Sequence, residues 1–318
     1  MPGQETPAAV SDLTERELIA RVSRQLPLPP DWMVVGIGDD AAIVEPERNR
    51  LEVLSVDALV EGVHFDRAFT PPDAIGHRAL AVNLSDLAAM GATPRLALLS
   101  LALPATLSVS DFDGIVAGLA ALAGRYRLHV AGGNLTRSSG PLVVDVTVVG
   151  TVKRRRALLR SGARAGDELY VSGAVGAAAA GLQMLNNGLR SGAHGLAGSA
   201  GDALKVESCL RRYLYPEPRV RLGSLLGRNR AASACMDVSD GLADAVWQMA
   251  EASGVGATID ADMLPIDPDA RQWFASRGAD AAYEAIAKSD DYELLVAVRP
   301  KAPGRLRAAR LYGDVPSR

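Results

Sequence analysis

Three aliphatic segments of strand length, separated by two helical segments, limit the folds that this chain can adopt. The strand-like segments are LEVLSVDAL (51–59), RLALLSLAL (95–103) and PLVVDVTVVGTV (141–152), all rich in aliphatic and β-branched residues. Residues 72–94 and 110–128 have apolar side chains at helical spacing. Inward positions of the first helix are Ile75, Ala79, Val82 and Met90. Strands that alternate with helices predict an α/β fold.

The strand at 141–152 has one apolar face and one mixed face. Because side chains alternate along a strand, the residues of the apolar face are Leu142, Val144, Val146 and Val148. The residues of the mixed face are Val143, Asp145, Thr147 and Val149. A mixed face on a central strand fits either a partner subunit or solvent, and the sequence leaves both open.

The strand and helix pattern restarts after the basic segment 153–168. A strand, LYVSG (169–173), is followed by a glycine-containing turn and a helix from Ala177 to Leu185. A chain of 318 residues is long for one compact unit. The sequence therefore predicts two α/β domains, residues 1–150 and 151–318.

The rest of the second half predicts a loop, two helices, a strand and a third helix. Residues 186–203 are small and polar, typical of an insertion loop, and we expect His194 to be solvated. The following elements are a helix that ends at Tyr215-Pro216, a helix from Pro218, a strand at 234–238 and a helix from Asp240.

The N-terminal segment predicts a short helix and no membrane signal. Thr14 and Glu17 match a capping box, and Leu18, Val22 and Leu26 share one helical face. We expect the preceding dozen residues to be unstructured. The segment has no apolar core of the signal-peptide kind, and no later run reaches the length of a membrane span.

Composition excludes several classes of function. A net charge of -3 gives no basic footprint for nucleic acid. Cys209 and Cys235 are too few for a disulfide framework and lack the spacing of a zinc site, which favours a reducing compartment. We therefore expect a cytoplasmic protein without a membrane or nucleic-acid partner.

Aspartates recur at the ends of predicted elements. Asp39 and Asp40 follow a glycine turn in GIGDDAAIV (36–44), and Asp57 ends the strand LSVD. The others are Asp86 on a helix, Asp237 and Asp240 around a strand-to-helix turn, and Asp290 and Asp291 before a strand. Read singly, GIGDD fits a solvated turn and CMDVSDGL fits a helix cap. Read together, carboxylates without His or Cys partners suit Mg²⁺ shared with a polyphosphate.

The usual phosphate-binding signatures are missing. The sequence has no GxxxxGK[ST], no HRD and DFG pair, and no GxGxxG after a strand, which excludes ordinary kinase folds. VSGAVGAAAAGL (171–182) has glycines at a strand-to-helix turn, and we interpret them as structural.

In their order along the chain, seven motifs resemble one family. They are GIGDDAA, SVDALVEGVHF, AVNLSDLAAMGATP, AGGN, RSGARAGDELYVSG, MDVSDGLADAV and DDYEL. Together they resemble the thiamine-monophosphate kinase family of the aminoimidazole-ribonucleotide synthetase-like superfamily, over roughly residues 12–298. The resemblance implies an N-terminal sheet that forms a dimeric barrel with its twin in a homodimer, and a C-terminal α/β sandwich. It also implies ATP-dependent conversion of thiamine monophosphate to the diphosphate.

The resemblance implies roles for twelve residues. Positions that match magnesium ligands are Asp40, Ser55, Asp57, Asp86, Asp237 and Asp240. Positions that match nucleotide contacts are Gly133, Asn134, Arg160 and Ser239, and those that match substrate contacts are His64 and Asp290. Without the resemblance, a partly buried structural role is an equal alternative for His64.

Several positions depart from the family pattern. Asn134 replaces a common Asp, Val56 replaces a hydroxyl residue, and Lys288-Ser289-Asp290 replaces Gly-Gly-Glu. The family also continues past Arg318, so we expect part of the substrate pocket to be absent or altered. The alternatives are a non-catalytic module that binds Mg-nucleotide or thiamine phosphate, and a sister ATP-dependent synthetase.

Overall fold

The computed structural model describes residues 9–190, 200–287 and 289–300, which divide into two compact units. The first unit contains the chain up to Asn83 together with Pro94–Thr151. The second contains Leu84–Thr93 and the chain from Val152 onward. The division is therefore not a single cut, and the domain limits near residue 150 stay a prediction.

A four-stranded sheet forms the centre of the first unit, with the strand order β3-β6-β4-β5. The described elements are η1 (Val10–Asp12), α1 (Glu15–Gln25), β1 (Met33–Val35), β2 (Ile43–Val44), β3 (Arg50–Val60), α2 (Pro72–Ala89), β4 (Thr93–Pro104), α3 (Val109–Tyr126), β5 (His129–Ser138) and β6 (Val143–Lys153). Strands β1 and β2 pair separately as an antiparallel hairpin.

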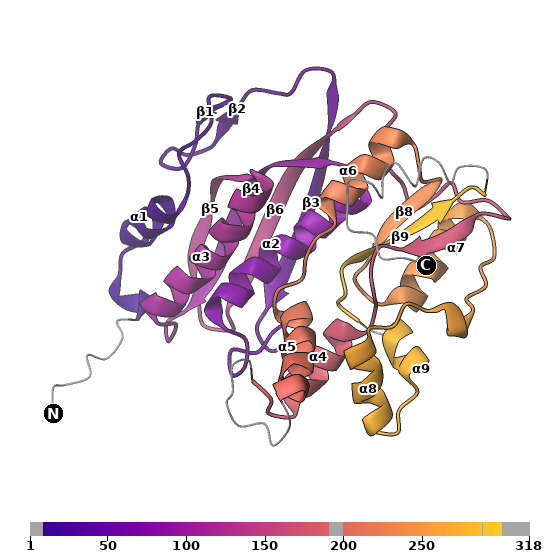
Figure 1. Cartoon of the computed structure of the whole chain (residues 1–318). Helices are drawn as coiled ribbons and strands as arrows, with labels where there is room; N and C mark the ends of the chain where they lie inside the picture. The colour runs from indigo at the N-terminus through magenta and orange to yellow at the C-terminus, as the bar shows by residue number, and fades with distance from the viewer. Residues whose placement is uncertain (1–8, 191–199, 288, 301–318) are drawn as a thin grey trace. The chain divides into compact units, whose positions relative to one another are not determined.

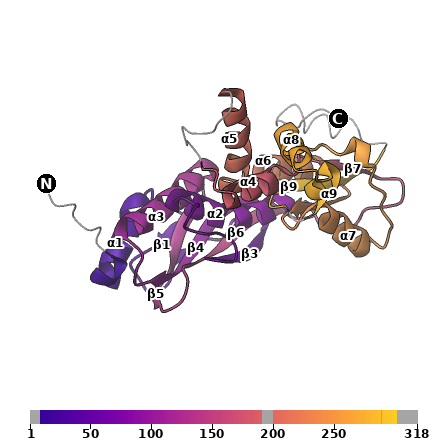
Figure 2. The same ribbon diagram turned by 90° about the horizontal axis from the view of Figure 1, so that it is seen from below.

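Helices α2 and α3 cover one face of this sheet (Figures 1 and 2). The two helices approach closely at glycines, because a Cβ on Gly118 would lie 1.9 Å from the carbonyl oxygen of Asp73. On the covered face Val144, Val146 and Val148 are fully buried, whereas Val143 and Asp145 are only partly buried. The alternation predicted for this strand is therefore confirmed.

The N-terminal predictions are confirmed for the helix and wrong for the residues before it. Thr14 and Glu17 form the capping box of α1, and Leu18 and Val22 are buried. Residues 9–12, expected to be unstructured, include η1. Val10 is buried, and its N–H donates to the Leu107 carbonyl at 2.9 Å. Residues 1–8 lie outside the described residues.

Strand β5 was not predicted from the sequence. Its segment HVAGGNLTRS is polar and contains Gly132 and Gly133, so it lacks the alternating apolar pattern of a strand. It forms because its backbone pairs in parallel with β4, with an irregularity between Ala97 and Leu98. Main-chain pairing does not require apolar side chains, so the pattern could not reveal it.

The second unit contains a three-stranded antiparallel sheet with the order β7-β9-β8. Its elements are β7 (Glu168–Val171), α4 (Ala177–Asn186), α5 (Ala200–Leu214), α6 (Val220–Asn229), β8 (Ala234–Val238), α7 (Leu242–Ser253), η2 (Ala261–Met263), α8 (Pro268–Ser276), α9 (Ala281–Ile286) and β9 (Glu293–Val298). All of β9 is buried, and α7 packs on β8 and β9 through Leu242, Val246 and Met249.

The predicted order of elements is confirmed for the second unit, with two corrections. Helix α5 begins at Ala200, so the predicted loop at 186–203 does not extend to its expected end, and residues 191–199, including His194, lie outside the description. Helices α8 and α9 were not predicted. Cys209 and Cys235 are buried and free. Within the described ranges, no helix has the length and hydrophobicity that a bilayer crossing requires.

The glycines of VSGAVGAAAAGL are structural, as interpreted from the sequence. Gly176 has φ +89° and is the N-cap of α4. A Cβ on Gly181 would lie 2.1 Å from the carbonyl oxygen of Cys209, so the glycine permits close packing of α4 on α5.

Candidate functional site

A hollow of about 1180 Å³ in the first unit brings together three predicted site residues. It lies over the uncovered face of the sheet, because Ser100, Asp145 and Thr147 alternate with residues buried under α2 and α3. Its other walls are α1 and the turn 36–42 between β1 and β2. The hollow is lined by Asp40, a predicted metal ligand, and by Gly133 and Asn134, predicted nucleotide contacts.

The turn that carries Asp39 and Asp40 is exposed. Gly38 has φ +122°, a conformation that favours glycine, and the Asp40 N–H donates to Oδ1 of Asp39 at 2.8 Å. The solvated turn that GIGDD suggests by itself is thus present. The Asp40 side chain is exposed at the hollow and is therefore accessible to a solvated ligand.

Strand β3 and the turn after it carry three further predicted residues. Ser55 and Asp57 are partly buried and alternate with exposed Leu54 and Val56. Asp57 does not end its strand, as the sequence suggested, because β3 continues to Val60. The aliphatic residues after Asp57 extend the pairing.

His64 is exposed just after β3. Its Nδ1 accepts a hydrogen bond from the Val60 N–H at 3.1 Å, which fixes the ring at the strand end. The burial expected by the structural alternative is therefore wrong, although the hydrogen bond to Val60 gives the ring a structural contact.

Gly133 has a structural reason to be glycine. A Cβ at this position would lie 1.8 Å from the carbonyl oxygen of Leu99 on β4. At Gly132, a Cβ would make only ordinary contact, 3.6 Å from Leu98. Strand pairing alone thus excludes a side chain at Gly133, whether or not a nucleotide lies nearby.

One end of the sheet in the second unit gathers Ser239, Asp240 and Asp290. Because β8 and β9 are antiparallel, the end of β8 lies beside the start of β9, where Val238 pairs with Glu293. The residues that follow β8 also contact the segment before β9, since a Cβ on Gly241 would lie 1.6 Å from the Ala287 carbonyl oxygen.

The cap interpretation of CMDVSDGL is wrong. The N-cap residue of α7 is Gly241, with φ +104°, which has no side chain to accept hydrogen bonds from the helix amides. Neither Ser239 nor Asp240 occupies the capping position. The two polar side chains at this turn are therefore not explained by helix capping.

Asp237 is a buried carboxylate beside a second carboxylate. Its side chain accepts a hydrogen bond from Ser85 Oγ at 2.9 Å, and the residue is only 4% exposed. The pKa of Asp237 is raised to about 6, mainly by burial and further by the charge of Asp86, while Ser85 and Arg160 oppose the rise. Arg160, which is exposed, also donates to Gln248 Oε1 at 2.7 Å.

This arrangement fits a hard divalent cation. A cation that binds the oxygens of a buried carboxylate stabilises it against the repulsion of a neighbouring carboxylate. The available donors are all oxygen atoms, which hard divalent cations prefer. In residues 9–190, 200–287 and 289–300, however, no three His, Cys, Asp or Glu side chains form a group that could hold a metal ion. The complete ligand set therefore stays a prediction, with Asp40, Ser55 and Asp57 in the first unit and Asp86, Asp237 and Asp240 in the second.

The sequence patterns did not predict the ionic cluster around Glu293. Glu293 is fully buried and binds Arg212 Nη2 at 2.6 Å and Arg219 Nε at 2.7 Å, and the Ser172 hydroxyl also donates to it. Burial by itself raises the pKa of Glu293, but Arg219 and Arg212 outweigh burial and lower it. The available signal was a single acid at the start of an otherwise apolar strand, ELLVAV.

Asp291 is structural in the same region. Its carboxylate accepts hydrogen bonds from the N–H groups of Gly176 at 2.7 Å and Ala178 at 3.2 Å, at the start of α4, and from the Ser289 hydroxyl at 2.7 Å. Asp290, its partly buried neighbour, remains the predicted substrate contact. Lys288 lies outside the described residues.

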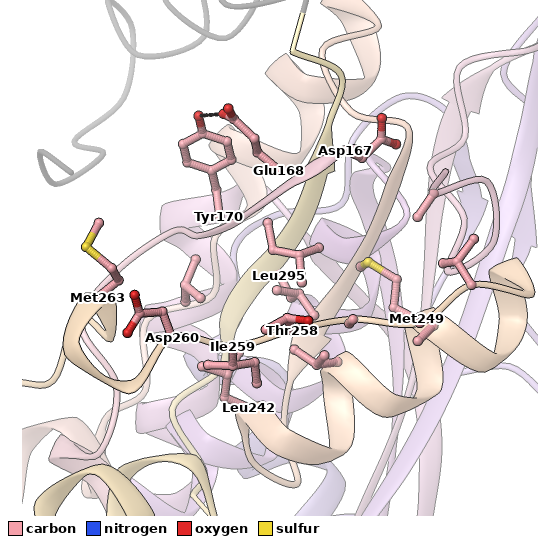
Figure 3. A pocket seen from close by; sticks show the side chains of 18 of the residues that line it. Asp167, Glu168, Tyr170, Leu242, Met249, Thr258, Ile259, Asp260, Met263 and Leu295 are labelled. Carbon is pink, nitrogen blue, oxygen red and sulfur yellow. Dashed lines mark hydrogen bonds between the residues drawn. The ribbon is translucent and has the colours of Figure 1, made fainter. Parts of the chain in front are cut away.

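A second hollow, of about 700 Å³, lies beside β7 and α7 in the second unit (Figure 3). Leu242, Met249 and Leu295 line it, and its acidic side chains are engaged locally, as in the 2.5 Å hydrogen bond from Tyr170 to Glu168 (Figure 3). None of the twelve predicted site residues lines this hollow. It is an opening beside the apolar core rather than part of the predicted site.

Comparison with known proteins identifies both halves of the chain. Residues 38–152 match the N-terminal domain of AIR synthase related proteins, and residues 164–313 match the C-terminal domain. The thiamine-monophosphate kinase of Bacillus subtilis (strain 168) is 36% identical over 268 residues, which cover 82% of this chain and 80% of that protein.

Solved structures agree with this assignment. The thiamine-monophosphate kinase of Stenotrophomonas maltophilia K279a is 38% identical, with a TM-score of 0.83, and the match covers 96% of this chain and 92% of that one. A structure described as AaThiL complexed with AMPPCP and TMP is 30% identical, with a TM-score of 0.72, over 95% of this chain and 89% of that one. The two-domain α/β fold expected from the sequence is confirmed, and the chain belongs to the thiamine-monophosphate kinase family of AIR synthase related proteins.

Proposed function

We propose that this protein phosphorylates thiamine monophosphate to thiamine diphosphate, using ATP and Mg²⁺, by direct in-line phosphoryl transfer. The observation that carries the proposal is the buried Asp237 carboxylate, which lies beside the charge of Asp86 at a sheet end. The relatives named thiamine-monophosphate kinase, and a neighbour that binds AMPPCP and TMP, supply the substrates of the proposal.

The proposed ligands of Mg²⁺ are the six residues of the sequence prediction. These are Asp40, Ser55, Asp57, Asp86, Asp237 and Asp240. When bound, Mg²⁺ offsets the negative charge of the two phosphate groups that must approach one another.

The other predicted residues hold the two substrates. For the nucleotide these are Gly133, Asn134, Arg160 and Ser239, and for thiamine monophosphate they are His64 and Asp290. Arg160 is exposed and can turn its guanidinium toward phosphate oxygens, in exchange for its hydrogen bond to Gln248.

The reaction does not need a strong general base. The acceptor is a phosphate oxygen whose second pKa is near 6, so it is largely ionised at neutral pH. The chain has only four histidines, and the one in the proposed site, His64, holds its ring by accepting from Val60 through Nδ1. The residues therefore orient and neutralise the substrates rather than remove a proton.

The direct test is product identification by mass spectrometry after incubation with ATP, Mg²⁺ and thiamine monophosphate. We expect thiamine diphosphate and ADP from the natural protein and almost none from Asp57→Asn. Consumption of ATP only with another acceptor would indicate a sister synthetase and reject the proposal.

One observation favours the alternative of a non-catalytic module that binds Mg-nucleotide or thiamine phosphate. Ser289, which departs from the glycine that the family resemblance implies, is buried and donates to Asp291. This hydrogen bond restrains the turn beside Asp290. Tight nucleotide binding without any product in the same assay would support the module.

We also propose that the protein is a cytoplasmic homodimer. Exposed apolar side chains on the first unit's sheet support an interface with a second copy, notably Leu54 at 67% and Val56 at 57% exposure on the edge strand β3. Sedimentation analysis should give a dimer for the natural protein and a monomer for Leu54→Asp.

A further inference from the structure

The hairpin that carries Asp39 and Asp40 is too small to hold its own position. Strand β1 has three residues and β2 has two, and the turn 36–42 between them is exposed or partly exposed throughout. A two-stranded hairpin is marginally stable in water, even when its strands are longer. The position of the turn therefore depends on what holds the base of the hairpin.

The Arg95 side chain, from β4, touches both sides of that base. Its guanidinium carbon lies 4.2 Å from the centre of the Trp32 ring, which precedes β1. The same guanidinium donates a hydrogen bond to the carbonyl of Glu45, which follows β2. The Glu45 N–H in turn donates to the Trp32 carbonyl at 2.8 Å, so the three residues close the base.

The base also packs on the sheet. Met33 is buried against Leu96 of β4 and Ala131 of β5. The Trp32 ring meets the His129 ring edge-on, with centroids 5.7 Å apart and an interplanar angle of 85°. The base is thus held on β4 and β5, while the turn at the other end projects over the hollow that Asp40 lines.

We propose that Arg95 and Trp32 form a clamp that fixes the turn 36–42, and with it Asp39 and Asp40, at the mouth of the first unit's hollow. Arg95 also lines the hollow, but both of its described contacts are with the hairpin base, so we assign it as a positioning residue that acts through the hairpin. The flat guanidinium stacks on the indole and donates a hydrogen bond at the same time, which an ammonium group cannot reproduce. The catalytic consequence of the clamp rests on the proposed function, whereas its structural consequence does not.

The test compares Arg95→Gln and Arg95→Lys with Arg277→Gln. The control breaks the same kind of contact in the second unit, where the Arg277 guanidinium carbon lies 3.5 Å from the centre of the Trp273 ring. Two measurements are made on the full chain: amide hydrogen exchange of residues 33–45, and steady-state kinetics with Mg·ATP varied.

We expect Arg95→Gln to accelerate exchange at residues 33–45 about tenfold and to raise the KM for Mg·ATP about tenfold, with kcat within about twofold. Arg95→Lys should keep the charge yet show much of both effects, because it loses the stack. Arg277→Gln should leave both measurements unchanged.

Each contrary outcome has a distinct meaning. Unchanged exchange in Arg95→Gln would overturn the clamp, whatever the activity. A KM restored by Arg95→Lys while exchange stays slow in both variants would instead make Arg95 a direct phosphate contact. Faster exchange in Arg95→Gln, together with a natural protein that forms no thiamine diphosphate, would sustain the clamp and reject the proposed function. Faster exchange with an unchanged KM would reject the positioning role.

Discussion

In the second unit Asp237 and Glu293 are buried in the strands of a packed sheet, whereas in the first unit Asp39 and Asp40 are exposed on a small hairpin. The buried acids lose hydration when the chain folds, so their surroundings must compensate. Glu293 has two arginines, whereas Asp237 has the Ser85 hydroxyl, a backbone hydrogen bond and the charge of Arg160, which leave its pKa raised. The exposed acids keep their hydration. The comparison teaches that a carboxylate can be made available to a cation in two ways: by incomplete charge compensation in the core, or by exposure on a turn whose base is packed on the sheet.

The largest effect should come from breaking the Glu293 cluster. We expect Glu293→Gln to lower the free energy of unfolding by about 3 kcal/mol, because Arg212 and Arg219 lose a charged partner that is fully buried. The measurement is urea unfolding of the full chain, followed by far-UV circular dichroism.

The matched control is a more exposed ion pair in the first unit. Asp113→Asn removes the pair with Arg21, in which both side chains are about a third exposed, and should cost less than about 1 kcal/mol. Equal losses in the two variants would show that burial does not distinguish the two pairs.

Asp237→Asn should separate activity from stability. We expect activity to fall about 10²- to 10³-fold, because a charge at the phosphates is lost. The free energy of unfolding should stay the same or rise by about 1 kcal/mol, because Asn ends the repulsion from Asp86 and still accepts from Ser85. Product assays and urea unfolding measure the two quantities.

Asp40→Asn is the matched variant at an exposed carboxylate, for comparison with the buried Asp237. It should lower activity while changing the free energy of unfolding by less than about 0.5 kcal/mol, since the side chain is exposed. A destabilised Asp237→Asn would contradict the view that this buried charge is incompletely compensated.

Gly133→Ala should reveal the structural role of a predicted nucleotide contact. The added Cβ meets the Leu99 carbonyl oxygen, so we expect a loss of about 1–3 kcal/mol in unfolding free energy. Gly132→Ala, with only ordinary contact, should change it by less than about 1 kcal/mol. If Gly133→Ala raises only the KM for ATP and leaves thermal stability intact, the strand-packing explanation fails.

The smallest effect is a pH dependence. Arg219 and Arg212 lower the pKa of Glu293 in spite of burial, so its ionisation stabilises the fold at neutral pH and this contribution is lost as pH falls below about 4.5. The difference in unfolding free energy between the natural protein and Glu293→Gln should therefore shrink from pH 6 toward pH 3. A difference that stays constant over this range would contradict the ionic account.

Local sequence patterns predicted the secondary structure well where apolar periodicity or a capping motif marks an element. Val144, Val146 and Val148 mark the covered sheet face, and the capping box at Thr14 marks the start of a helix, because both depend on neighbours a few residues away. Strand β5 escaped prediction because its pairing with β4 satisfies the backbone without apolar side chains.

By itself, the sequence determined the α/β class, most of the elements in their order, and the family, since periodicity and ordered motifs are properties of the chain; β5, α8 and α9 were among the exceptions. Only the tertiary structure decided which acids are buried. Asp237 and Asp240 look alike in CMDVSDGL, yet Asp237 is 4% exposed beside Ser85 from another element, whereas Asp240 is exposed. The tertiary structure also decided which charged groups meet, as in the ion pair of Glu293 with Arg212 and the contact of Arg95 with the Trp32 ring. Coulomb and stacking interactions depend on distance in space, and spacing along the chain does not give that distance.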